Sequence, residues 1–168
     1  AYEAGLAPAF ELYGLGFEHK HVPETQRYAG LTRRPIFVPS VGNYRQGMLV
    51  SVPLHLDTLT GKPSGADLHA ALAKRYAGSK YVSVMPLENA ATKGGKLEPE
   101  ALNETNMLEL YVFASEKHRQ AVLVARAGRD ERPPTLGRAS DGEDAISRAR
   151  QCLGVRPRRI ERDDLAAR

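Results

Sequence analysis

The chain has 168 residues, of which 42% are hydrophobic, and a formal net charge of +4; these values are typical of one folded domain with its own core. No apolar run approaches the roughly 18 residues of a membrane span and no signal peptide is visible, so we expect a cytoplasmic protein. The single cysteine, Cys152, excludes an internal disulfide and a cysteine-built metal site within one chain. The first residue is Ala1 and not methionine, which suits a chain that begins partway through a longer protein.

The N-terminal part of the sequence leads into a dense polar block. Residues 1–5 are expected to form the last turn of a helix, and residues 9–15 a strand. The block that follows, Phe-Glu-His-Lys-His-Val-Pro-Glu at 17–24, holds two of the five histidines. Proline suits the first turn of a helix because its missing N–H costs nothing there, so Pro23 predicts a short helix over 23–29.

This arrangement places His21 just before a helix N-terminus, where a side chain can point into a cleft. An imidazole titrates near neutrality when unperturbed, which makes His21 the natural general acid/base of such a site. The spacing alone leaves open a second interpretation, in which His19 and His21 lie on an exposed polar turn.

The middle of the chain reads as strands and one helix. The apolar run 36–38 predicts a buried strand, and the nearly continuous apolar run 48–56 predicts a strand buried on both faces. Within that second strand, Pro53 cannot donate to a ladder and marks an edge position or a bulge. Ser64 is predicted to cap a helix over 66–76, where apolar residues recur at spacings of four.

The following segment completes a mixed sheet. Residues 81–85 alternate as a strand, residues 88–100 are expected to form a loop, and 108–113 with 120–125 give a good hairpin signal. The predicted fold class is therefore α+β, a mixed β-sheet with helices on one face.

Three blocks carry a resemblance to a known family. His-Lys-His-Val-Pro-Glu at 19–24, Pro-Ser-Val-Gly-Asn-Tyr-Arg-Gln-Gly-Met at 39–48 and Leu-Asn-Glu-Thr-Asn at 102–106 resemble signatures of the N-acetyl-gamma-glutamyl-phosphate reductases. They occur in the family's order and roughly at its spacing, and the resemblance covers residues 1–126. In the third block Glu104 departs from the family's glycine.

The resemblance implies the catalytic and dimerisation domain of a semialdehyde dehydrogenase, like the C-terminal domain of glyceraldehyde-3-phosphate dehydrogenase. It implies an NADP-dependent enzyme of arginine biosynthesis that reduces an acyl phosphate to a semialdehyde and assembles as a homodimer or higher homo-oligomer. His21 matches the family's acid/base histidine. Lys20 and His19 beside it, with Arg45 or Gln46, match substrate-binding positions, and Asn106 matches a position that organises a loop or faces the cofactor.

Two required features of the reductase are absent from the sequence. The family's nucleophilic cysteine motif does not occur, and there is no Gly-x-Gly-x-x-Gly fingerprint for a dinucleotide. We therefore expect half an enzyme that is inactive alone. A non-catalytic dimerisation module and a fragment similar to aspartate-semialdehyde dehydrogenase are alternatives, and no feature calls for a metal, which needs three or four convergent ligands.

Composition changes after residue 126. No lysine follows Lys117, and the polar, proline-bearing segment 127–134 is typical of poorly ordered chains. We expect residues 127–168 to be an atypical arginine-rich tail in place of the family's natural ending, most simply through a shifted reading frame. Its arginines allow a remote alternative, contact with nucleic-acid phosphates, but acidic residues interleave with them and no aromatic residue follows Phe113 for base stacking.

Overall fold

The computed structural model describes residues 8–87 and 95–129, which form parts of two compact units. The first unit contains the described residues up to Asn43, and the second those from Tyr44 onward. We describe each unit by itself. The helix turn expected over 1–5 and nearly all of the predicted tail lie outside the described residues.

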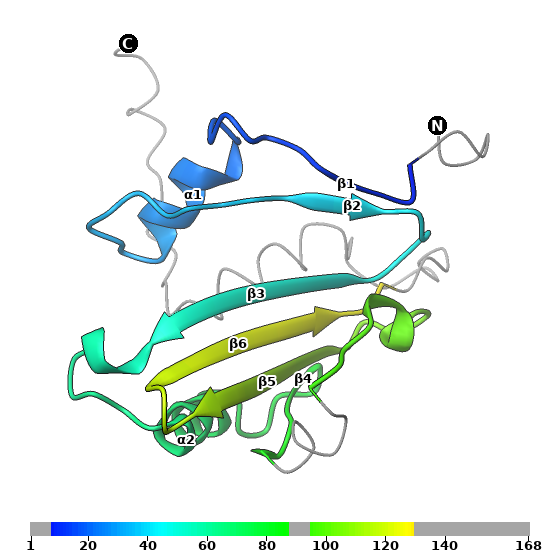
Figure 1. The fold of residues 1–168 in the computed structure, drawn as a ribbon. Helices are drawn as coiled ribbons and strands as arrows, with labels where there is room; N and C mark the ends of the chain where they lie inside the picture. Colours follow the sequence, from blue (N-terminus) through cyan, green and yellow to red (C-terminus); the bar gives the residue numbers. More distant parts are fainter. Residues whose placement is uncertain (1–7, 88–94, 130–168) are drawn as a thin grey trace, which may run out of the picture. The chain divides into compact units, whose positions relative to one another are not determined.

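The first unit pairs two short strands and contains one helix (Figure 1). Strand β1 (Phe10–Leu12) runs antiparallel to β2 (Ser40–Gly42), and α1 (His21–Tyr28) lies between them in the sequence. The predicted strand and helix around the histidine block are confirmed, although the strand is shorter than expected and the helix begins two residues earlier.

The buried strand predicted over 36–38 is wrong. Ile36 is 85% exposed and Val38 47% exposed, and the second strand of the pair forms only at β2. Pro35 and Pro39 flank the apolar run and remove two backbone donors, so the run cannot form a regular ladder.

The second unit is a four-stranded mixed sheet in the order β3-β6-β5-β4. Strand β6 (Gln120–Ala127) runs antiparallel to both of its neighbours, β3 (Met48–His55) and β5 (Leu108–Ser115), whereas β4 (Val82–Val84) runs parallel to β5. The 3₁₀ turns η1 (Leu56–Thr58) and η2 (Pro99–Leu102) connect elements. Helix α2 (Gly65–Arg75) packs against β5 and β4, which confirms the α+β fold with a helix on one face.

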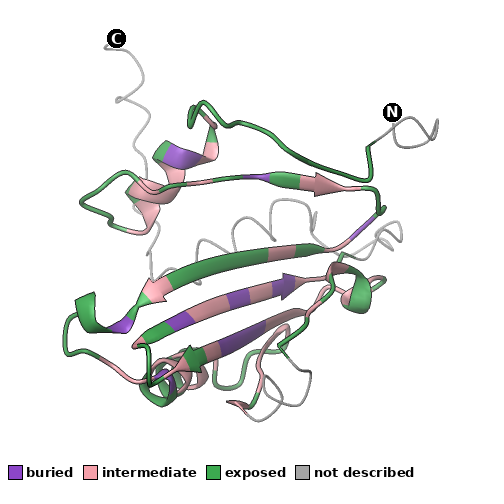
Figure 2. Cartoon of the chain, in the orientation of Figure 1, coloured by how far each residue is buried: buried purple, intermediate pink, exposed green. Residues whose placement is uncertain are grey.

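Burial concentrates in the middle of this sheet and not on β3, the first strand in the order (Figure 2). Tyr111 and Val112 are almost fully buried, whereas Met48, Val50 and Val52 are 46%, 42% and 41% exposed. The prediction that β3 is buried on both faces is therefore wrong. β3 is an edge strand, and α2 packs against β5 and β4, away from it. The edge position that Pro53 predicted is confirmed.

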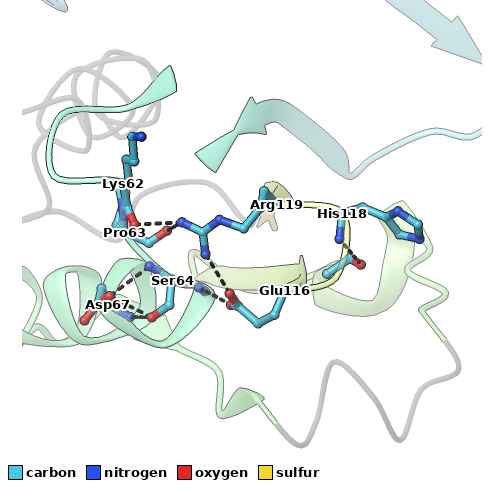
Figure 3. Close-up of polar contacts among 9 residues, drawn as sticks. Lys62, Pro63, Ser64, Asp67, Glu116, His118 and Arg119 are labelled. Carbon is cyan, nitrogen blue, oxygen red and sulfur yellow. Dashed lines mark hydrogen bonds and ion pairs between the residues drawn. The ribbon is translucent and has the colours of Figure 1, made fainter. Parts of the chain in front are cut away.

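The start of α2 is locked to the tip of the β5–β6 hairpin (Figure 3). Ser64 caps the helix as predicted: its hydroxyl accepts from the Asp67 amide, and the Asp67 carboxylate accepts from the Ser64 amide. From the hairpin tip, Glu116 accepts the Gly65 amide at 2.8 Å, and Arg119 donates to the Lys62 carbonyl at 2.7 Å. These contacts fix the helix on the sheet.

Candidate functional site

The histidine block satisfies the backbone donors at the start of α1 from its own residues. The His21 amide donates to His19 Nδ1 at 3.3 Å, and the Val22 amide donates to the His19 carbonyl at 3.0 Å. The next residue, Pro23, has no amide hydrogen to satisfy. The helix can therefore begin at His21, although Lys20, the residue before it, makes no side-chain capping bond.

His21 is half-buried and paired with a carboxylate. Its Nδ1 lies 3.1 Å from Glu24 Oε2, and the two side chains are 35% and 44% exposed. Because a carboxylate only accepts, Nδ1 carries the hydrogen and Nε2 of the neutral ring keeps a lone pair. The arrangement gives His21 a fixed tautomer and leaves Nε2 as the nitrogen that can accept or return a proton.

His19 occupies a different environment from His21. Its ring centroid lies 4.9 Å from that of His21, 5.1 Å from that of Phe37 and 5.8 Å from that of Tyr13. Its Nδ1 already accepts the His21 amide, so only Nε2 is left for any other contact. Lys20, between the two histidines, is exposed.

The second block of predicted site residues belongs to the second unit. Arg45 is exposed, whereas Gln46 is only 6% exposed, and neither polar atom of the Gln46 amide has a hydrogen-bond partner among the described residues. Gly47 follows with φ of +98°, and a Cβ there would lie 2.2 Å from the Pro99 carbonyl oxygen. Glycine is therefore required, and it brings the Arg45–Gln46 loop against η2.

η2 leads into the third block, so the structure brings the second and third blocks together. Asn103 ends η2, and Asn106, which was predicted to organise a loop or face the cofactor, is half-buried. Glu104 has φ of +60°, the left-handed conformation in which glycine is unstrained. This conformation is the one that a glycine adopts without strain, and Glu104 adopts it despite its Cβ.

Sequence reasoning missed the carboxylate partner of His21. The Glu24 carboxylate holds the imidazole of His21, a role that the sequence analysis did not assign to it. The signal was present, because a His and a Glu three residues apart in one helical turn lie on the same face.

A buried polar network between β5 and β6 was also missed. Arg126, 4% exposed, donates through Nε to Glu109 at 3.0 Å, pairs with the same carboxylate through Nη2, and donates to the Tyr111 hydroxyl at 2.7 Å. The Tyr111 hydroxyl donates to Glu109 at 2.6 Å. Burial and the neighbouring Glu109 carboxylate raise the pKa of Tyr111 to about 12.

Comparison with known proteins identifies the family. The model of the semialdehyde dehydrogenase dimerisation domain matches residues 2–127, which is three quarters of the chain. The chain belongs to the semialdehyde dehydrogenase dimerisation-domain family. The fold and the resemblance predicted from the sequence are thereby confirmed.

Full-length relatives of this dimerisation domain are similar to the chain at 44–51% identity. The N-acetyl-gamma-glutamyl-phosphate reductase 2 of Pseudomonas putida is 48% identical over 122 residues, 73% of this chain and 39% of that protein. The corresponding reductase 2 of Nostoc sp. is 44% identical over 148 residues, 87% of this chain and 44% of that protein. The reductase of Brucella ovis is 51% identical over 114 residues, 68% of this chain and 36% of that protein.

The chain thus spans about two fifths of the length of the curated relatives it matches. An alignment that covers 87% of the chain also runs past residue 127, where the family model ends. Part of the arginine-rich segment is therefore included in an alignment with a relative.

Other classes of site were sought in the described parts of the chain. Residues 8–87 and 95–129 hold no group of three His, Cys, Asp or Glu side chains arranged to bind a metal ion. Among the same residues, no helix has the length and apolar character of a membrane span.

Proposed function

We propose that this chain is the catalytic and dimerisation part, over residues 1–126, of an N-acetyl-gamma-glutamyl-phosphate reductase. Two things support it: the reductases to which the chain is similar, and the His21–Glu24 pair within the motif that first suggested this family. The observation that carries most weight is the half-buried imidazole of His21, whose Nδ1 lies 3.1 Å from the Glu24 carboxylate. Such a pair is built for proton transfer and adds little to stability at this exposure.

In the proposed reaction, His21 Nε2 accepts the proton of a cysteine thiol supplied from outside residues 1–126. The thiolate attacks the acyl phosphate carbonyl, phosphate leaves with the electrons of the broken C–O bond, and a thioester remains. After reduction, His21 returns its proton to the oxygen of the resulting hemithioacetal. Glu24 stabilises the imidazolium that forms between these two steps.

Substrate contacts are proposed for three residues and a cofactor contact for a fourth. Lys20 is exposed beside His21 and offers an ammonium to the substrate's carboxylate or phosphate. Arg45 and Gln46 supply a guanidinium and an amide in the second unit. A buried amide without partners costs about 1–3 kcal/mol, and tolerance of that cost is typical of binding positions. Asn106 is proposed to face the cofactor or to organise the loop in which it lies.

The described residues contain no dinucleotide-binding βαβ unit for the nicotinamide cofactor that the proposed reaction needs, NADP by resemblance. β4 and β5 form the parallel pair of the sheet, and the described part of their connection contains η2, with no helix that opens on a glycine-rich turn. The reduction step therefore requires the dinucleotide-binding part of a longer enzyme or a separate chain.

A chimera tests this proposal. Residues 2–127 of this chain would replace the matched part of the Pseudomonas putida reductase, and phosphate-dependent semialdehyde oxidation would be followed by nicotinamide absorbance. The chimera should be active, and His21→Asn should lower its kcat on the order of a hundredfold or more. His118→Asn, on the hairpin tip, is the matched control and should leave the rate unchanged. An active chimera in which both variants behave alike would contradict the role of His21.

A non-catalytic dimerisation module is the second candidate, favoured by one observation. Met48, Val50 and Val52 expose apolar side chains in a row on one face of β3. A module of this kind would dimerise as proposed for the enzyme, but the chimera would be inactive whatever residue stands at 21.

A further inference from the structure

The two histidines of the block use the same atom, Nδ1, in opposite ways. Nδ1 of His19 accepts a hydrogen from the His21 amide, whereas Nδ1 of His21 faces a carboxylate and must donate. When both rings are neutral, His19 is therefore protonated on Nε2 and His21 on Nδ1. These opposite tautomers follow from the donors and acceptors around each ring.

His19 is also fixed in place by its neighbours. Its ring is flanked by Tyr13 and Phe37, and the Cβ position of Gly14 lies 3.7 Å from His19 Cδ2. The loop just before it is held by Arg34, which donates to the Phe17 carbonyl at 2.8 Å and to the Glu18 carboxylate at 3.2 Å. A ring seated in this way is a rigid acceptor for the first amide of α1.

We propose that His19 is a positioning residue, which acts through His21 and does not contact the substrate. Its Nδ1 takes the first amide of α1 and its carbonyl takes the second, so His19 performs the capping that the Lys20 side chain does not. This fixes the backbone of His21 while Glu24, one turn later, fixes the ring. The inference rests on the proposed function only in giving His21 the proton-transfer role, and it replaces the substrate contact expected for His19 by resemblance.

Two variants of the full chain separate the acceptor from the aromatic ring. His19→Asn retains a side-chain acceptor for the His21 amide and loses the ring, whereas His19→Phe retains the ring and loses the acceptor. Amide hydrogen exchange at His21 and long-range nitrogen NMR spectra of the rings would be recorded at about pH 8.5, where unperturbed imidazoles are neutral. Amides of β5 and β6, in the second unit, report whether the chain is still folded.

The proposal predicts that His19→Asn keeps the His21 amide protected, while His19→Phe makes it exchange about fivefold faster, the effect of one lost cap. The wild-type spectra should show the proton on Nε2 of His19 and on Nδ1 of His21. Equal exchange in both variants, or an unprotected His21 amide in the wild type, would overturn the proposal.

The chimera described above supplies a kinetic readout. A positioning role predicts that His19→Phe lowers kcat with little change in KM, and that His19→Asn restores most of the loss. A substrate ligand would instead raise KM in His19→Phe, which would overturn the proposal. If the wild-type chimera has no activity, the proposed function fails, while the NMR experiment still decides whether His19 holds His21.

Discussion

At the scale of single residues, the structure shows hydrogen-bond contacts that the residue types alone do not predict. The sequence motif singled out His21, and the structure adds that Glu24 orients its ring while His19 holds its backbone. The residue types predict neither contact, because each depends on which ring nitrogen of the histidine faces the neighbouring amide or carboxylate. The departure of Glu104 from glycine likewise becomes meaningful only when its φ of +60° is known.

Glu104 gives the first prediction. The left-handed conformation costs a residue with a Cβ about 1–2 kcal/mol, whereas ordering a glycine costs about 0.5–1 kcal/mol in lost chain entropy. Glu104→Gly should therefore raise the free energy of unfolding by about 0.5–1 kcal/mol, measured by urea denaturation. Glu100→Gly, in η2 nearby, is the control and should not stabilise the chain. A loss of stability in Glu104→Gly would show that the glutamate side chain contributes more than its strain costs.

Tyr111 predicts a dependence on alkaline pH. Its pKa is about 12 in the folded chain and 10 in the unfolded chain, so folding favours the protonated hydroxyl. This contribution to stability is fully present below pH 10 and is lost as the pH rises from 10 through 12. Urea unfolding between pH 9 and 11.5 should show a steeper fall in stability for the wild type than for Tyr111→Phe. Parallel curves would contradict the assignment.

At the scale of secondary-structure elements, caps, edge positions and hairpins could be predicted from the sequence, whereas the burial of individual strands could not. The Ser64–Asp67 capping box, the edge position of Pro53 and the β5–β6 hairpin follow from signals within a few residues. The run 36–38 was misjudged because its two flanking prolines outweigh its apolar character. The burial of β3 was misjudged because it depends on where α2 lies, which the residues of β3 do not determine.

The docking of α2 on the hairpin gives the third prediction. A Cβ at Gly65 would lie 2.4 Å from Ala114 Cβ, so the helix start and β5 cannot both stay in place. Gly65→Ala should destabilise the chain by about 2 kcal/mol or more, within the range of overpacked cores. Gly16→Ala is the control, because nothing lies within 4 Å of its Cβ position. Thermal unfolding that is equal for the two variants would contradict the close packing.

At the scale of the whole molecule, an uncovered apolar strip favours assembly. Register places Val50 opposite Ala125 and Ser51 opposite Val124, so these two β3 residues point to opposite faces of the sheet. Ala125 lies opposite both Val50 of β3 and Leu110 of β5, so these three residues point to one face of the sheet. Ala114, four residues after Leu110 on β5, points to the same face and lies against Gly65 of α2. Val50 is therefore on the face that α2 covers. α2 packs on β5 and β4, and the β3 end of this face is left exposed.

The fourth prediction is therefore a dimer that uses this face. The full chain should be dimeric at micromolar concentration in light scattering, and Val50→Lys should shift it to monomers because a charge would then enter an apolar interface. Ser51→Lys, on the other face of the same strand, should leave the dimer intact. A monodisperse wild-type monomer, or equal effects of the two lysines, would contradict the assignment of the interface.

We propose that this chain carries the acid/base residue of a reductase whose thiol and cofactor site lie outside residues 1–126. The most direct measurement is phosphate-dependent oxidation of the semialdehyde by the isolated chain, followed at the nicotinamide absorbance band. We predict no turnover above background, and turnover that requires His21 once a cysteine-bearing, dinucleotide-binding half is added. Turnover by the chain alone that survives Cys152→Ala would contradict the claim.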